Sequence, residues 1–113
     1  MGATSLFVTL ILTSLNVWSG NGIISKRCVS DSGLSIYDID LDITNRNGEI
    51  RYRFMGQDTF YVVRLERVEN EFVQGIATFK ESRTGDTRGN SFTFIYDYKK
   101  NIFFELNTVS KCN

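Results

Sequence analysis

Residues 35–54 read SIYDIDLDITNRNGEIRYRF, and apolar and polar side chains alternate in both halves of this stretch. Side chains of an extended strand point alternately to opposite faces of a sheet, so Tyr37 and Leu41 share one face and the aspartates the other. Asn47-Gly48 lies between the two halves and is a strong signal for a two-residue hairpin turn, because both residues tolerate positive φ. The stretch therefore predicts a β-hairpin with an apolar face and a charged face.

A turn at these two residues also predicts the register of the hairpin. It places Leu41 opposite Phe54 on the apolar face and Asp42 opposite Arg53 on the charged face. Large side chains then pack against each other on one face, and opposite charges meet on the other.

Residues 38–49, DIDLDITNRNGE, also have the outline of a calcium-binding loop, with three alternate aspartates and a glutamate eleven positions after the first. An EF-hand loop needs glycine at its sixth position for a sharp turn, and that position is Ile43 here. In a strand the aspartates would lie about 7 Å apart in a row, too far apart to converge on one ion. We therefore predict a solvent-facing strand and no metal site.

Further stretches alternate in the same way. FYVVRLERV and FVQGIATFK predict two more strands, the first of them after a turn at residues 56–58, and FTFIYDY and IFFELNT predict another pair. A short strand near residues 23–29 precedes them all, and no window of helical period is long enough to compete. The expected fold is all-β, a small antiparallel meander of six to seven strands forming a barrel or a sandwich.

Two of the predicted loops also fix a register. A three-residue loop at residues 69–71 opposes Leu65 with Gly75, so that a large side chain packs against a small one. A second three-residue loop, at residues 99–101, contains two lysines and an asparagine. The asparagine tolerates a left-handed conformation, and the loop opposes Tyr96 with Phe104. Both pairs are predicted to face the core.

The N-terminal segment differs in composition from the rest, because all 13 basic and all 13 acidic residues follow Gly22. Its apolar run, residues 6–15, is shorter than the roughly 20 residues of a membrane span and is typical of a secretory signal. We predict a signal peptide over residues 1–22, cut after Ser19 or Gly22, and a single β domain over residues 23–113. The protein is then secreted or periplasmic, without stable membrane insertion of the mature form. Because no basic residue precedes the apolar run, an uncleaved N-terminal strand is the alternative.

Two cysteines follow the predicted signal, Cys28 and Cys112. Export and an even count favour a disulfide between them, and two reduced cysteines in a cytosolic protein are the alternative. The chain has no histidine and no third cysteine, which disfavours a zinc site and the usual serine or cysteine triads. No metal, cofactor or catalytic residue is predicted.

One connection is too long for a tight turn: residues 80–91, KESRTGDTRGNS, are polar and punctuated by glycine. Loops carry function more often than strands do. Two interpretations are open. The segment is a hairpin tip with no role, or it is a partner-binding loop in which Arg83 and Arg88 offer planar donors and Asp86 offers a carboxylate. The competing binding site is the charged face of the first hairpin, with Asp38, Asp40, Asp42, Arg51 and Arg53.

Basic and acidic residues balance at 13 each, so no global field attracts nucleic acid or an anionic membrane. The leading hypothesis is a non-catalytic binding or inhibitory module for an unknown protein or envelope partner. A small barrel that binds a lipophilic ligand is the alternative, and a carboxylate-based enzyme is a weaker one. An apolar pocket above about 300 Å³ would favour the ligand barrel, whereas a flat exposed patch would favour the partner.

Overall fold

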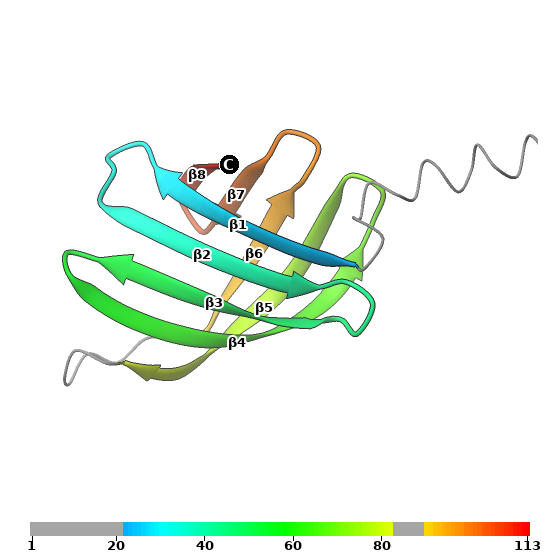
Figure 1. The fold of residues 1–113 in the computed structure, drawn as a ribbon, viewed down its shortest axis with the longest axis horizontal. Coiled ribbons are helices and arrows are strands. Elements are labelled where there is room, and N and C mark those ends of the chain that lie inside the picture. Colours follow the sequence, from blue (N-terminus) through cyan, green and yellow to red (C-terminus); the bar gives the residue numbers. More distant parts are fainter. Residues whose placement is uncertain (1–21, 83–89) are drawn as a thin grey trace, which may run out of the picture.

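Eight antiparallel strands close into a barrel in the computed structural model, which describes residues 22–82 and 90–113 (Figure 1). Each strand pairs with its neighbours in the sequence, and the last pairs with the first. The all-β meander is therefore confirmed, and it takes the form of a barrel rather than a sandwich. The strands are β1 (Ile23–Ser30), β2 (Ser35–Asp42), β3 (Asn47–Phe54), β4 (Gln57–Val68), β5 (Phe72–Ser82), β6 (Phe92–Asp97), β7 (Ile102–Glu105) and β8 (Thr108–Cys112).

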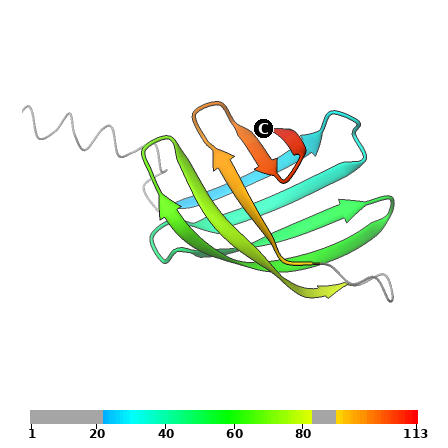
Figure 2. The same cartoon turned by 180° about the vertical axis from the view of Figure 1, so that it is seen from behind.

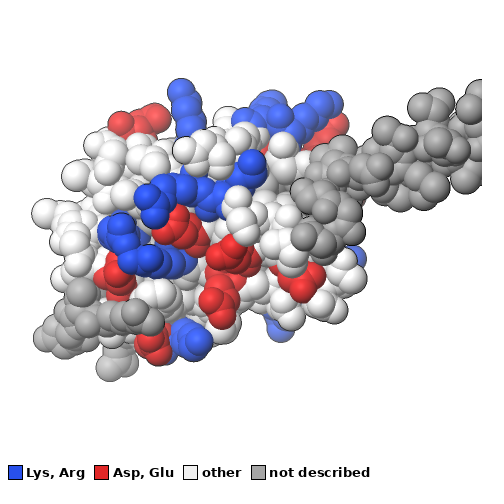
Figure 3. Space-filling view, viewed as in Figure 1, with Lys and Arg blue, Asp and Glu red and all other residues white. Residues whose placement is uncertain are grey.

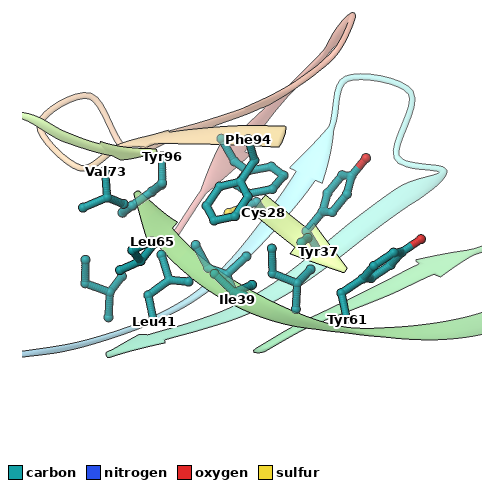
Figure 4. Close-up of a cluster of buried hydrophobic side chains, with 14 residues drawn as sticks. Cys28, Tyr37, Ile39, Leu41, Tyr61, Leu65, Val73, Phe94 and Tyr96 are labelled. Atoms are coloured by element: carbon teal, nitrogen blue, oxygen red, sulfur yellow. The ribbon is translucent and has the colours of Figure 1, made fainter. Parts of the chain in front are cut away.

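The inner faces of the strands meet in one hydrophobic core (Figure 4). Fourteen buried hydrophobic side chains of the described residues form it, and every strand from β1 to β7 contributes at least one. Phe94 and Phe103 stack at the centre, with ring centroids 5.4 Å apart. An eight-stranded barrel is just wide enough for side chains to fill, and full burial of a large apolar side chain contributes about 1.5 to 3 kcal/mol.

The first hairpin forms, but its predicted register is wrong. Leu41 pairs with Gly48 instead of Phe54, and Asn47 and Gly48 belong to β3 rather than to the turn. The partner of Leu41 changes by six positions, an even number, so the same side chains still face the core. The alternation therefore predicts the buried face correctly even though the turn lies elsewhere.

The physical reason for this register lies in the turn at residues 43–46. The Asp42 carboxylate accepts hydrogen bonds from the backbone N–H of Asn45 at 3.0 Å and from its side-chain amide at 2.8 Å. These bonds lower the pKa of the Asp42 carboxyl below its usual value. Arg46 then takes a left-handed conformation with φ of 58°. An aspartate-initiated turn of this kind closes the hairpin before the Asn-Gly pair is reached.

Two-residue turns occur at two other places. Phe54 pairs with Gln57, and the intervening Met55 and Gly56 have φ of 51° and 81°. Positive φ at both central residues is the type I′ geometry that suits the twist of antiparallel strands. The turn predicted at residues 56–58 therefore lies at residues 55–56, and residues 57 and 58 belong to β4.

The second two-residue turn accounts for the eighth strand. IFFELNT, predicted as one strand, is interrupted at Leu106 and Asn107, because Glu105 pairs with Thr108 across the turn. Leu106 has φ of 49°. The chain reverses there into β8, which returns along β7 and reaches β1.

The two predicted loop registers have different outcomes. Leu65 pairs with Gly75 as expected, on strands joined through residues 69–71. Tyr96, however, pairs with Phe103 and not with Phe104. This odd shift exchanges faces, so Phe103 is buried and Phe104 is 37% exposed.

The cause of the β6–β7 shift is a longer loop. The Asp97 carboxylate accepts hydrogen bonds from the backbone N–H groups of Lys99 and Lys100, at 3.0 and 2.9 Å. Because Asp97 pairs with Ile102, four residues separate the strands instead of three. Asn101 takes the left-handed conformation expected of it, with φ of 60°.

Replacing Gly75 should destabilise the barrel through overpacking. A Cβ at this position would lie 2.8 Å from the carbonyl oxygen of Arg64, 3.0 Å from Phe94 Cζ and 3.1 Å from Leu65 Cδ2. We expect Gly75→Ala to lower the free energy of unfolding by about 1 to 3 kcal/mol, measured by urea denaturation. Thr78→Ala, at an exposed position of the same strand, is the control. Unchanged stability of the Gly75 variant would contradict the close packing of β4, β5 and β6.

The predicted disulfide is present. Cys28 and Cys112 are bonded, and they are opposite each other in the β1–β8 pairing. The bond therefore lies at the seam where the first and last strands of the barrel meet. A disulfide is compatible with folding in an oxidising compartment.

Two of the sequence predictions fall outside the described residues. They are the signal peptide over residues 1–22, of which only Gly22 is described, and the loop residues Arg83, Asp86 and Arg88. Within residues 22–82 and 90–113, no helix has the length and apolar character needed to cross a membrane.

Candidate functional site at one end of the barrel

One end of the barrel is formed by the β1–β2, β3–β4 and β7–β8 turns, since alternate turns of a meander lie at the same end (Figures 1 and 2). We call this the tip end. Its turns carry Leu34, Met55 and Leu106, which we call the tip residues, and they are 55%, 74% and 84% exposed. They are the three most exposed large hydrophobic residues in the described part of the chain. A concentration of such side chains at one end is unusual for a protein surface and marks a candidate binding region.

Two of the tip residues have strained backbones. Met55 and Leu106 lie in the left-handed region of φ, where a side chain with a Cβ costs about 1 to 2 kcal/mol. Glycine or asparagine avoids much of this cost, and either is the usual choice in such turns. Because both side chains are mostly exposed, burial of their apolar surface offsets little of the strain. Strain of this kind is more common at functional sites than elsewhere.

A pocket of about 260 Å³ lies beside the β7–β8 turn, with Leu106 in its wall. We call it the mouth pocket. Its central contact is a hydrogen bond of 2.8 Å that the Tyr37 hydroxyl donates to Glu105 Oε1. Tyr37 is on β2 and Glu105 ends β7, so this bond joins strands separated in the sheet by β1 and β8. The pocket is lined by Tyr37, Tyr52, Tyr61, Asn90, Ser91, Phe92, Glu105 and Leu106.

Aromatic packing holds the hydroxyl groups of the mouth pocket in place. The Tyr37 ring contacts Tyr52 and Phe103, at centroid distances of 4.8 and 4.7 Å. Tyr61 meets Phe92 edge-on at 4.9 Å. Figure 4 shows the hydroxyl groups of Tyr37 and Tyr61 pointing the same way, out of the core. Rings fixed on both sides present their hydroxyl groups at defined positions.

Tyr37 and Tyr61 of the mouth pocket are neutral at physiological pH. Burial raises the pKa of Tyr37 far above its ordinary value, and the hydrogen bond to Glu105 raises it further. Burial is also the main reason why the pKa of Tyr61 is raised. Among the described residues, Glu105 forms no salt bridge with a lysine or arginine. The pocket therefore combines neutral donors and acceptors with one carboxylate.

The charged face of the first hairpin is the competing candidate binding site. It extends over β1 to β4, and its ion pairs differ from those predicted from the sequence. Figure 3 shows basic and acidic side chains interleaved on it. Arg53 binds Asp58 at 3.0 Å instead of Asp42, and Arg51 binds the same carboxylate at 3.0 Å. Asp38 accepts two hydrogen bonds from Arg27, at 2.7 and 3.1 Å.

Most charges of this face thus satisfy one another, and exposed pairs of this kind contribute about 0 to 1 kcal/mol each to stability. Among the residues that the structure describes, no group of three or more potential metal-ligating side chains is found. The charged face offers fewer unpaired groups to a partner than its sequence suggests.

A second exposed apolar surface covers the outer side of β5 to β8, and we call it the outer patch. Ile95, Phe104 and Val109 lie in one row across β6, β7 and β8. A shallow depression of about 340 Å³ beside them is lined by Phe72, Ile95, Asp97 and Phe104. This surface was missed in the sequence because Phe104 was assigned to the core.

The predicted loop residues Arg83, Asp86 and Arg88 are not among the described residues. The described neighbours of the loop do lie at the tip end. The Ser82 hydroxyl donates a hydrogen bond of 3.3 Å to the carbonyl oxygen of Asp58, and Asn90 lines the mouth pocket. The loop therefore leaves and re-enters the barrel at the end that carries the tip residues.

No family model matches the chain, and no curated protein or solved structure shows significant similarity to it. Fold and site together define a small antiparallel β-barrel with a disulfide at its seam, a tyrosine-lined pocket and three exposed apolar residues in the turns of one end.

Proposed function

We propose that the protein is a non-catalytic binding module that captures a protein partner with the tip end of its barrel. The exposure of Leu34, Met55 and Leu106 at one end, two of them on strained backbone, is the observation that supports this most strongly. Replacement by asparagine or glycine would relieve the strain and remove exposed apolar area at once. The combination of strained backbone and exposed apolar side chains therefore supports a binding role for these side chains.

Two other functions receive less support from the geometry. A lipophilic ligand needs an enclosed, mostly apolar cavity. The 260 Å³ mouth pocket has tyrosines, a serine, an asparagine and a carboxylate in its wall besides Phe92 and Leu106, and the 340 Å³ depression beside the outer patch is apolar but shallow and lies outside the barrel. A carboxylate-based enzyme needs a second carboxyl group close to the first. Glu105 has a tyrosine as its hydrogen-bond partner instead.

The proposal includes export, with a signal peptide over residues 1–22 and a secreted or periplasmic location. The disulfide between Cys28 and Cys112 supports this, because such bonds persist mainly in oxidising compartments. The partner is then a protein or envelope component of that compartment. Inhibition is one outcome of such capture, if the partner is an enzyme.

Replacing the three tip residues should abolish capture without loss of stability. We expect Leu34→Ser, Met55→Asn and Leu106→Asn together to weaken partner binding at least tenfold, about 1.4 kcal/mol or more. The midpoint of urea denaturation should stay unchanged or rise, because asparagine relieves the strain at two positions. The measurement is affinity capture from the native secretome or periplasm, followed by titration of the captured partner.

The control removes a similar amount of apolar surface from the outer patch, through Ile95→Thr, Phe104→Thr and Val109→Thr. Partner binding by this control should equal that of the parent. If the control loses binding while the tip variant binds like the parent, the outer patch is the binding surface instead of the tip end.

A further inference from the structure

The mouth pocket contains one negative charge that no described cation neutralises. We infer that it is a subsite for a single cationic side chain, an arginine, presented by the protein partner. This inference rests on the proposed function, because the partner would bring the arginine to the tip end. It adds the chemistry by which the partner is recognised.

The Glu105 carboxylate has unused hydrogen-bond capacity. A carboxylate accepts about four hydrogen bonds, and Glu105 receives one from a protein side chain, the Tyr37 hydroxyl. Tyr37 keeps its proton because it is buried, so its hydroxyl is committed to Glu105 Oε1. The acceptor left for a ligand consists of Oε2 and the second lone pair of Oε1. A ligand that uses it must be a donor, and a positively charged donor gains most from it.

The shape of the mouth pocket suits an arginine side chain. The walls of the pocket are aromatic, from Tyr52, Tyr61 and Phe92, and a volume of about 260 Å³ is suited to one long side chain. The aliphatic stem of arginine packs on such walls while its charged head reaches a carboxylate. A guanidinium group also has a planar fork of donors that matches the two oxygens of a carboxylate, which an ammonium group lacks.

An exposed apolar side chain lies beside the mouth pocket. Leu106 lines the pocket and is also a tip residue, so at least one exposed apolar side chain adjoins the carboxylate. Arginine is enriched among the residues that dominate protein interfaces, where a ring of apolar contacts excludes water around it. Leu106 would supply part of that ring. The partner would therefore present an arginine flanked by apolar side chains.

The test is a titration of the oxidised protein with N-acetylarginine amide, followed by NMR. We expect saturable shifts of the side-chain resonances of Tyr37, Tyr61 and Glu105, and at least tenfold weaker binding by Glu105→Gln. Glutamine keeps an acceptor for the Tyr37 hydroxyl but removes the charge. Glu49→Gln removes a charge from the outer face of β3 and should bind like the parent.

Neutral N-acetylnorleucine amide should produce no saturable shifts, and N-acetyllysine amide should bind more weakly than the arginine compound. Three results would each overturn the subsite: no saturable shifts with the arginine compound, equal affinity of Glu105→Gln and the parent, or equal binding of the norleucine compound. Tighter binding of the lysine compound would overturn the assignment to arginine.

The subsite and the proposed function can fail separately. If capture of the partner depends on the tip residues but Glu105→Gln captures it with the parent's affinity, the subsite is wrong and the function stands. If the arginine compound binds as expected but the tip variant captures the partner normally, the function is wrong and the subsite stands.

Discussion

Loss of the Cys28–Cys112 disulfide is expected to lower the free energy of unfolding by about 4 to 5 kcal/mol, a large share of the roughly 5 to 15 kcal/mol by which native proteins are stable. The bond spans 84 residues of sequence, and closing a loop of that length restricts the unfolded chain strongly. In the folded state it lies at the β1–β8 seam, which consists of three residue pairs. Without the bond, this short ladder and a backbone hydrogen bond of 3.1 Å from the Asn113 N–H to the Arg27 carbonyl oxygen hold the first and last strands together.

The measurement compares urea denaturation of the oxidised protein with that of the double variant Cys28→Ser and Cys112→Ser. Mass spectrometry of protein taken from its native compartment provides the check on oxidation, since the bonded form is two hydrogens lighter than the reduced form. Equal stability of the two proteins would show that the seam does not depend on the bond. Free thiols in the native material would weaken the case for export as well.

Alternation along the chain is enough to predict which side chains are buried in most strands. Tyr37, Ile39 and Leu41 face the core although the turn of their hairpin was placed incorrectly. The reason is geometric, because a register error of an even number of residues leaves every side chain on its own face. An odd error does not, and a single extra loop residue before Ile102 was enough to exchange Phe103 and Phe104.

Turn positions were the weak part of the sequence prediction. The Asn47-Gly48 pair has the strongest intrinsic preference for a hairpin turn, yet Asp42 and Asn45 close the chain earlier through side-chain hydrogen bonds. Met55-Gly56 forms the two-residue turn instead. A local preference of about 1 kcal/mol is overridden here by the hydrogen bonds of the Asp42 turn, since a shift by an even number of residues leaves the buried faces unchanged.

The tip residues could have been noticed in the sequence, because alternation is interrupted where Met55-Gly56 and Leu106-Asn107 occur. An apolar residue followed by glycine or asparagine between two strands is a two-residue turn with an exposed side chain. The contact between Tyr37 and Glu105 was beyond sequence reasoning. It joins residues 68 positions apart and depends on closure of the barrel, which brings β2 and β7 around a shared interior.

Any side chain at Gly48 is expected to destabilise the protein by about 3 kcal/mol, because this glycine lies in a strand against the backbone of its neighbour. A Cβ at this position would overlap the carbonyl oxygen of Asp40 and lie 3.0 Å from Leu41 Cα. Both atoms belong to the backbone of β2 and cannot rotate away, so the β2–β3 pairing must open. Gly48→Ala, measured by urea denaturation, should show the full effect.

Gly48→Asn separates this explanation from the turn predicted by the sequence. Asparagine is well tolerated in a type I′ turn, so a glycine required for positive φ would lose little on this replacement. A glycine required for space would lose as much with asparagine as with alanine. Gly33→Ala is the matched control, because Gly33 has φ of 79° and no atom within 4 Å of a built Cβ, so only the conformational cost of about 1 kcal/mol remains. If Gly48→Asn is nearly as stable as the parent while Gly33→Ala is not, the Asn-Gly pair forms the turn after all, and the register of the first hairpin must be redrawn.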